Sequence, residues 1–265
     1  MILLDKGRLL VDFDKDAENI IKTIRDIDGV MLTEPERFYV NHIVSGLKGI
    51  GVWTKIRALY GFVGGRAATH KWNWKDMRDT DDAFRIVWGG TVTHSLLGVK
   101  GDGNTGYGRC FFNLTTQGRL STVSVGLTIQ DKTGEGIGIG AGVGGSGIFG
   151  CSSNGFQFEP TGSIYSYTPQ RIGKSLAFSY STLNSPVCSI DGNIIPITLN
   201  SRIPTAPMPN FNINLLCRGK NSEADRDNFS AARYTSMFLG EPMSNQELFL
   251  TNNLLYTAQG ILSRK

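Results

Sequence analysis

Short apolar runs separated by glycine-rich turns fill most of the chain after residue 69. In the clearest run, 120–130, Val123, Val125 and Leu127 alternate with serine and threonine. This period of two places successive side chains on opposite faces of a strand. Asp191-Gly192-Asn193 separates two further apolar runs and predicts a tight hairpin. Many short strands with frequent turns predict an antiparallel β sandwich, which the 33 glycines and the low charged content of 19% also favour.

Three helices are predicted before the sandwich. The first covers 14–28, because isoleucines recur on one face and Gly29 follows. The second begins after Thr33, which forms a capping box with Glu36, so that each can accept from the backbone N–H of the other. A third helical piece is expected over 52–60.

The last quarter of the chain predicts a strand, a turn and an amphipathic helix. The strand covers 231–239, and Gly240 and Pro242 end it, because proline cannot continue a β ladder. Ser244 and Glu247 form another capping box ahead of leucines at helical spacing. A helix with one apolar face needs a surface to cover, which here is the predicted sheet.

The closing segment RYTSMFLGEPMSNQELFLTNNLL resembles the end of laminin-G-like (concanavalin A-like) jelly-roll domains, in which a short helix closes the sandwich. We therefore expect a mainly β fold, an antiparallel jelly-roll sandwich with an N-terminal helical region and a C-terminal capping helix. The expected boundaries are 1–66 for an arm with helices and 67–265 for the sandwich domain.

A second resemblance covers GIGVWTKIRALYGFVGG, which begins at Gly49, and ATHKWNWKDMRDTDDAFRIVW, which ends at Trp88. This stretch is similar to a family of virion proteins from tailed phages, many of which infect Bacteroidetes-type hosts. In that family two or three helices lead into a concanavalin A-like jelly roll. The resemblance implies a structural role on the phage particle, as a tail-fibre or head-fibre part, a receptor-binding tip or a decoration. It brings no catalytic residues.

The first twelve residues form an apolar arm that could pair as a strand or lie on a partner. Its attachment candidates are Ile2, Leu3, Leu4, Leu9 and Leu10. With the phage resemblance, we expect other virion proteins as partners and a homo-oligomer, most simply a trimer. The mechanism would be display, in which the arm and helices dock to the particle and the sandwich loops contact a host-surface glycan.

Charge and hydropathy exclude several other classes. The net charge is only +4 and the basic residues are scattered, so no nucleic-acid partner is expected. Asp5 and Lys6 interrupt the first apolar run, so we expect no signal peptide, and no run is long enough to insert in a membrane. The four cysteines lie far apart and predict buried free thiols. The expected location is the phage particle, after synthesis in the host cytoplasm.

The glycan-binding candidates are loop residues that offer aromatic rings, amides or carboxylates, the chemistry that binds sugars. They are Asp102, Asn104, Tyr107, Tyr165 and Tyr167. An alternative is that the rings pack against a sister subunit.

Calcium is the one metal that the sequence leaves open, because acidic loops supply the oxygen ligands that it prefers. Asp76 and Asp79 belong to an acidic cluster, and Asp102 is a second candidate. The alternative for the cluster is ion pairing with Lys75, Arg78 and Arg85. No other cofactor is expected, because the glycines at 140, 142 and 145 fall within a strand-like alternation instead of opening a helix.

We expect a protein that is not an enzyme. Glycan hydrolases of the jelly-roll class carry acids in the pattern Glu-x-Asp-x-x-Glu, which is absent, and Glu135 and Glu159 are isolated. The three histidines lie in no familiar catalytic arrangement. Two alternatives stay open, a glycan-processing enzyme of the jelly-roll hydrolase class and a structural decoration that binds no sugar.

Overall fold

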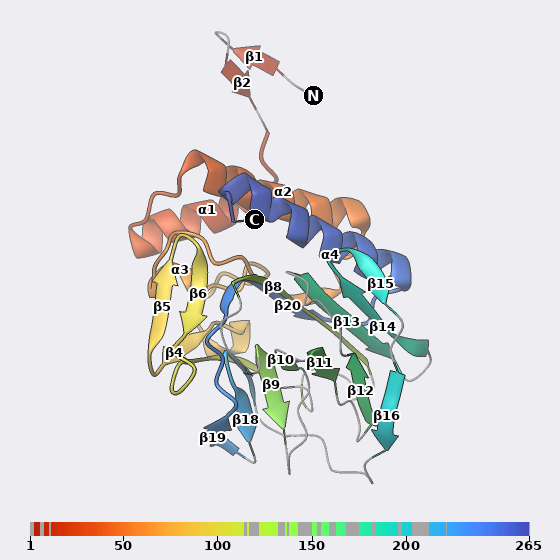
Figure 1. Cartoon of the computed structure of the whole chain (residues 1–265). Helices are drawn as coiled ribbons and strands as arrows, with labels where there is room; N and C mark the ends of the chain where they lie inside the picture. The colour runs from red at the N-terminus through yellow and green to blue at the C-terminus, as the bar shows by residue number, and fades with distance from the viewer. Residues whose placement is uncertain are drawn as a thin grey trace.

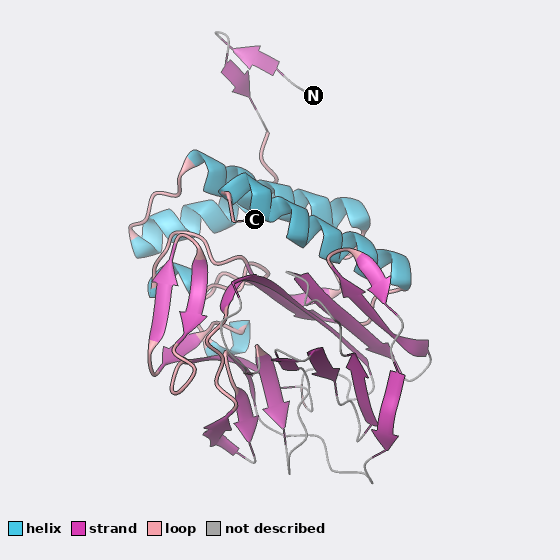
Figure 2. Cartoon of the chain, viewed as in Figure 1, coloured by secondary structure: helices cyan, strands magenta, loops and turns pink. Residues whose placement is uncertain are grey.

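A computed structural model describes residues 3–5, 8–10, 12–113, 116, 122–131, 136, 138–142, 150–152, 155–158, 163–167, 175–181, 184–195, 198–202, 212–220 and 222–264. Figure 1 shows a layer of helices over a large sheet, with further strands on the other side of that sheet. The long helices gather on one side of the strands, whereas short helical turns lie among the strands (Figure 2). The fold is the expected one, a mainly β, antiparallel jelly-roll sandwich with helices from both ends of the chain.

The helical elements are α1 (Lys15–Asp28), α2 (Glu34–Ile50), α3 (Ala67–His70), η1 (Asp81–Ala83), α4 (Asn245–Ala258) and η2 (Gln259–Leu262). Among the described residues, no helix is long and apolar enough to cross a membrane.

The large sheet runs in the order β15 (Asn193–Ile195), β14 (Asn184–Ile190), β13 (Ser175–Ser181), β8 (Thr122–Asp131), β20 (Arg233–Gly240), β6 (Gly98–Gly101) and β5 (Val92–Ser95), with β3 (Ile56–Tyr60) also paired to β20. The second sheet runs β19 (Ser222–Asp227), β18 (Arg218–Lys220), β9 (Ile139–Gly142), β17 (Asn212–Leu215), β7 (Tyr107–Asn113) and β4 (Val87–Gly89). A four-stranded sheet holds β10 (Gly150–Ser152), β11 (Gly155–Phe158), β12 (Ser163–Tyr167) and β16 (Thr198–Arg202), and β1 (Leu3–Asp5) pairs with β2 (Arg8–Leu10). The pairs are antiparallel, apart from β9 with β18.

The alternation predicted in β8 decides which side chains face each layer. Val125 and Leu127 belong to the apolar cluster between the two larger sheets. Ser124 and Thr128 point the other way, toward the helices, and are buried there. The sequence pattern therefore predicts the strand correctly, although its polar face is covered by helices and not by water.

Local capping signals place the helices as predicted. Thr33 with Glu36 and Ser244 with Glu247 both form complete capping boxes, so α2 and α4 begin where their sequences say they should. Gly29 follows α1 with φ of 66°, a left-handed conformation that glycine adopts without steric cost.

The third predicted helix, over 52–60, is wrong: residues 52–55 form a turn and not a helix. Ile56–Tyr60 is strand β3, which pairs antiparallel with β20. Ala58 and Tyr60 face the sandwich core, whereas Ile56 and Leu59 face the helices, so both sides of the segment are buried. A short segment that is apolar on both sides fits a central strand as well as a helix, and here pairing with β20 decides between them. One strand of the large sheet thus precedes residue 67.

Hydrogen bonds join the helices to the large sheet. The Asn252 amide of α4 donates to Ser189 Oγ at 2.9 Å and also bonds to the Ser175 hydroxyl, with all three residues buried. Ser179 Oγ donates to the Met243 carbonyl at 2.9 Å and accepts from the Met243 N–H at 2.8 Å. These bonds satisfy polar groups that would otherwise be buried without partners.

Candidate functional site

The loop between β6 and β7 is built around Asp102. Its carboxylate accepts from the backbone N–H groups of Asn104 at 3.0 Å, Thr105 at 2.8 Å and Gly106 at 2.8 Å. The Thr105 hydroxyl donates a fourth bond at 2.7 Å. The backbone donors, Thr105 first, hold the pKa of Asp102 far below its usual range. Asp102 therefore fixes the shape of the loop, with Oδ1 accepting from the three backbone N–H groups and Oδ2 from the Thr105 hydroxyl.

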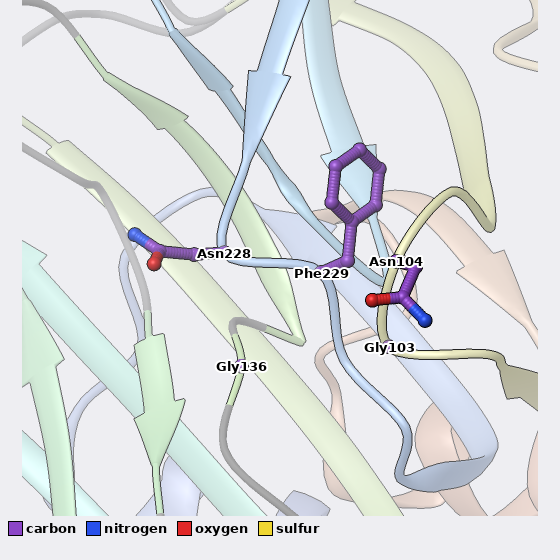
Figure 3. A pocket seen from close by; sticks show the side chains of 5 residues that line it. All are labelled: Gly103, Asn104, Gly136, Asn228 and Phe229. Carbon is purple, nitrogen blue, oxygen red and sulfur yellow. The ribbon is translucent and has the colours of Figure 1, made fainter.

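A pocket of about 270 Å³ opens beside this loop. It is lined by Gly103, Asn104, Gly136, Asn228 and Phe229 (Figure 3). In that view the side chains of Asn104 and Asn228 lie on opposite sides of Phe229. Neither asparagine side chain makes a hydrogen bond with another residue in the part of the chain that the structure describes, so both amides are available to a ligand.

An aromatic–guanidinium pair lies close in sequence to the residues that line the pocket, although neither member of the pair is a lining residue. Tyr107 follows Asn104 by three residues, and the Arg226 guanidinium carbon lies 3.7 Å from the centre of its ring. This distance is typical of a cation–π contact. The ring also lies closely over Gly89, where an added Cβ would stand 2.4 Å from Tyr107 Cζ, so a larger residue at that position would displace the ring.

The pair lies on the face of β7 that points away from the sandwich core. Cys110 and Phe112 of this strand belong to the core, whereas Tyr107, Arg109 and Phe111 alternate with buried residues and are half-buried. The outer face of β7 therefore carries aromatic rings and cations, while the pocket itself offers two amides and one aromatic ring.

Of the predicted glycan-binding residues Asp102, Asn104 and Tyr107, only Asn104 lines the pocket. Asp102 anchors the loop, and Tyr107 is the first residue of β7. Tyr165 and Tyr167 lie in β12, and their side chains are outside the described residues.

The attachment candidates of the arm form a hairpin, in which Leu3 pairs with Leu10 and Leu4 with Leu9. Ile2 and the side chains of these leucines lie outside the described residues, as do Glu135 and Glu159. The attachment role stays a prediction.

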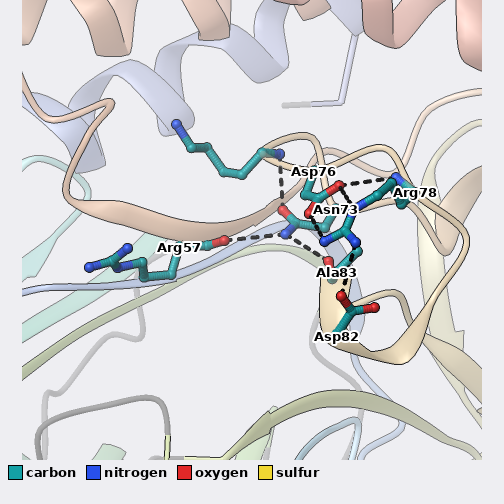
Figure 4. Close-up of polar contacts among 7 residues, drawn as sticks. Arg57, Asn73, Asp76, Arg78, Asp82 and Ala83 are labelled. Carbon is teal, nitrogen blue, oxygen red and sulfur yellow. Dashed lines mark hydrogen bonds and ion pairs between the residues drawn. The ribbon is translucent and has the colours of Figure 1, made fainter.

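Two of the three calcium candidates, Asp76 and Asp79, are engaged in ion pairs, and the third, Asp102, accepts the loop hydrogen bonds described above. Asp76 pairs with Arg78 at 2.6 Å, as Figure 4 shows, and Asp79 pairs with Arg85 at 3.1 Å and with Lys71. Hydrogen bonds and charge from Arg78 lower the pKa of Asp76. No group of three or more His, Cys, Asp or Glu side chains in the described residues is placed to hold a metal ion. The ion-pairing alternative therefore describes this cluster.

One proposed partner of the acidic cluster is wrong. The Lys75 ammonium donates to the Trp53 carbonyl at 2.7 Å and lies 3.5 Å from the centre of the Trp53 ring. Burial lowers the pKa of Lys75 to about 8. Its role is packing on Trp53, and it does not neutralise an aspartate.

Sequence reasoning missed Arg226, Asn228 and Phe229. They follow Asn104 by more than a hundred residues, and no short-range pattern links the two segments. An Asn–Phe pair directly after a charged strand was visible in the sequence, but only the fold brings it beside the loop.

Comparison with known proteins gives a likeness of fold. No family model matches the sequence, and a search of curated proteins gives no match. A Trypanosoma rangeli sialidase is similar with a TM-score of 0.49 and 11% identity over 86% of this chain and 40% of the sialidase. The binding domain of botulinum neurotoxin DC is similar with a TM-score of 0.47 and 9% identity over 77% of this chain and 52% of the domain.

A third similar structure is domain 4 of a GH43 extracellular arabinanase from Geobacillus stearothermophilus, in complex with arabinotriose. Its TM-score is 0.43 and its identity 15%, over 75% of this chain and 98% of the domain. The chain spans less than half the length of the sialidases. Sialidases and a glycoside hydrolase domain among the similar structures contradict our expectation that the chain is not an enzyme, and we withdraw that expectation.

Proposed function

We propose that the chain is a virion protein of a tailed phage whose sandwich binds a host-surface glycan through the pocket at Asn104. The observation that carries the glycan part is the pocket itself, with two amides and an aromatic ring beside a hydrogen-bonded loop. Amides can donate to and accept from sugar hydroxyls, and an aromatic face packs against the C–H face of a sugar ring. The virion part is supported by the resemblance of residues 49–88 to phage proteins.

The size of the pocket suits a small ligand. Its volume of about 270 Å³ lies just below the range usual for drug-sized molecules. We therefore propose that it holds one sugar residue of a longer chain, with neighbouring sugars lying along the outer face of the second sheet.

The helical layer lies on the other side of the large sheet from the second sheet (Figure 1). This arrangement supports a division of roles, in which the arm and helices contact other virion proteins or sister subunits and the second sheet faces the host. A trimer is the simplest assembly that the phage resemblance suggests.

Glycan binding can be tested with the full chain on a glycan array. Asn104→Ala, Asn228→Ala and Phe229→Ala should each weaken binding by about tenfold or more, because a lost hydrogen bond or ring contact costs roughly 1–3 kcal/mol. Asn245→Ala, at an exposed position that begins α4, is the matched control and should bind as the parent does. Equal binding by all four variants would remove the pocket from the proposal.

The virion part has its own test. Antibody labelling of purified phage particles should detect the chain, and its absence from particles would refute this part. Mass analysis of the glycan after incubation with the chain tests whether the glycan is cleaved. A shortened product would instead place the chain among glycan-processing enzymes.

A further inference from the structure

We propose that the glycan bound at this site is acidic and that Arg226 binds its carboxylate. This inference rests on the proposed glycan-binding function and adds the chemical class of the ligand. The argument begins from the partners of Arg226. Its Nε donates to Asn214 Oδ1 at 3.3 Å and its plane lies over Tyr107, and it forms no ion pair with any residue that the structure describes.

The acidic residues nearest to Arg226 in sequence do not neutralise it. Asp225 and Asp227 flank it in β19, and adjacent residues of a strand point to opposite faces. The Asp227 carboxylate is bound by Arg218 at 2.6 Å. A half-buried guanidinium without a carboxylate partner is the chemistry of an anion site, since such cations are usually paired when they leave water.

The contacts of Arg226 leave its two terminal nitrogens available to bind a carboxylate. Asn214 is buried beneath Arg226 and takes the Nε hydrogen, while Tyr107 covers one face of the plane. The two terminal nitrogens, Nη1 and Nη2, make no hydrogen bond within the described part of the chain. These two nitrogens form a fork that matches the two oxygens of a carboxylate.

Arg226 is also close in sequence to one of the two segments that line the pocket. It precedes Asn228 by two residues, and its stacking partner Tyr107 follows Asn104 by three. The guanidinium is thus tied to both segments that line the pocket. In the proposed complex the hydroxyls of a sugar meet Asn104 and Asn228 in the pocket, and its carboxylate extends beyond the lining residues to Arg226.

The test compares one ligand in two forms. Oligosaccharides that contain hexuronic acid are measured by calorimetry against the full chain, before and after chemical reduction of each carboxylate to a primary alcohol. The acidic form should bind on the order of 10- to 100-fold more tightly, as expected for hydrogen bonds to a charged group. Its affinity should also fall as salt is raised, because the site is partly exposed.

Variants assign the effect to one side chain. Arg226→Gln should bring the acidic form down to the affinity of the reduced form, and Arg226→Lys should restore part of the difference. Arg57→Gln, an exposed arginine on β3 paired with Glu241, is the control and should keep the full difference. Thermal melts of each variant establish that it is folded.

The outcomes separate this inference from the function on which it rests. Equal affinity of the parent chain for both forms would overturn the acidic ligand and leave a neutral glycan site standing. A preference for the acidic form that Arg226→Gln does not change would overturn the role of Arg226. Failure to bind any glycan, acidic or neutral, would overturn both proposals.

Discussion

The large sheet meets two different layers, and the two interfaces are held in different ways. Toward the second sheet its buried side chains are mainly apolar, with Phe178 and Leu127 among them. Toward the helices it adds buried serines that bond to Asn252 and to the Met243 backbone. Apolar surfaces tolerate small rearrangements, whereas a displaced hydrogen-bond partner leaves a buried polar group unpaired. Both interfaces bury a large apolar cluster, and the polar contacts on the helix side additionally fix the position of α4.

The largest expected effect is in the sandwich core. Phe178→Ala removes a fully buried ring and leaves a cavity, so the free energy of unfolding should fall by about 3–5 kcal/mol. Phe249→Ala, a ring on α4 that is 38% exposed, should cost well under half as much. Urea titration of both variants measures the difference, and similar losses would contradict a core centred between the sheets.

The polar interface under α4 gives the next effect. Asn252→Ala leaves the Ser175 and Ser189 hydroxyls without this partner, so the free energy of unfolding should fall by about 1–3 kcal/mol. Asn253→Ala changes the adjacent, less buried position and should cost much less. If hydrogen exchange shows α4 equally protected in both variants, these bonds do not position the helix.

The edge where the C-terminal segment meets the sheet predicts a pH dependence. His70 and His94 approach with Nδ1 atoms 3.1 Å apart, and the buried guanidinium of Arg264 and the Trp88 ring lie close to them. Burial lowers the pKa of His94 to about 4, and burial with the charges of His94 and Arg264 lowers the pKa of His70.

Because both pKa values are lower when folded, the stabilisation is complete above the unfolded value of ~6.5 and is lost as pH falls toward 4. After allowance for the partial exposure of His94, the loss should be about 1 kcal/mol. His94→Asn should flatten the slope between pH 6.5 and 4 in urea titrations. A slope confined to pH below 4 would point to carboxylates such as Asp14 instead, whose pKa is lowered in the fold by Lys48 and backbone N–H bonds that outweigh its desolvation.

The smallest effect belongs to the helix caps. Ser244→Ala removes the hydroxyl that accepts from the Glu247 N–H at 3.3 Å, and should lower the free energy of unfolding by about 0.5–1 kcal/mol. Ser244→Asp keeps an acceptor and is the control. An equal loss in both variants would show that the position matters for a reason other than capping.

The two layers also differ in how far sequence predicts them. Local capping motifs, Thr33 with Glu36 and Ser244 with Glu247, predict where α2 and α4 begin, and both starts agree with the structure. Strand β8 is equally clear from its alternation. Strand β3 is not, because its burial on both sides comes from partners far away in sequence. Local patterns predict elements, but they do not predict which element fills the centre of a sheet.

The same limit applies to the site. Glycine, aspartate and asparagine in the segment 101–108 predict a loop, and Asn104 lies in that loop and lines the pocket. Tyr107 was also expected in the loop, but it begins strand β7. The opposite wall of the pocket comes from Asn228 and Phe229, which reach it only through the folding of the sheets. The sequence therefore predicts the wall of the pocket that contains Asn104, but not the wall that contains Asn228 and Phe229.

The loop anchored by Asp102 has a consequence for how recognition can change over generations. Its bonds use the main-chain N–H of residue 104, not the side chain, so any residue other than proline at that position keeps the loop intact. The conformation of the loop therefore does not depend on the side chain at position 104. Under the proposed glycan-binding function, a single codon change at position 104 would alter the group offered to a sugar while the loop that presents it stays the same.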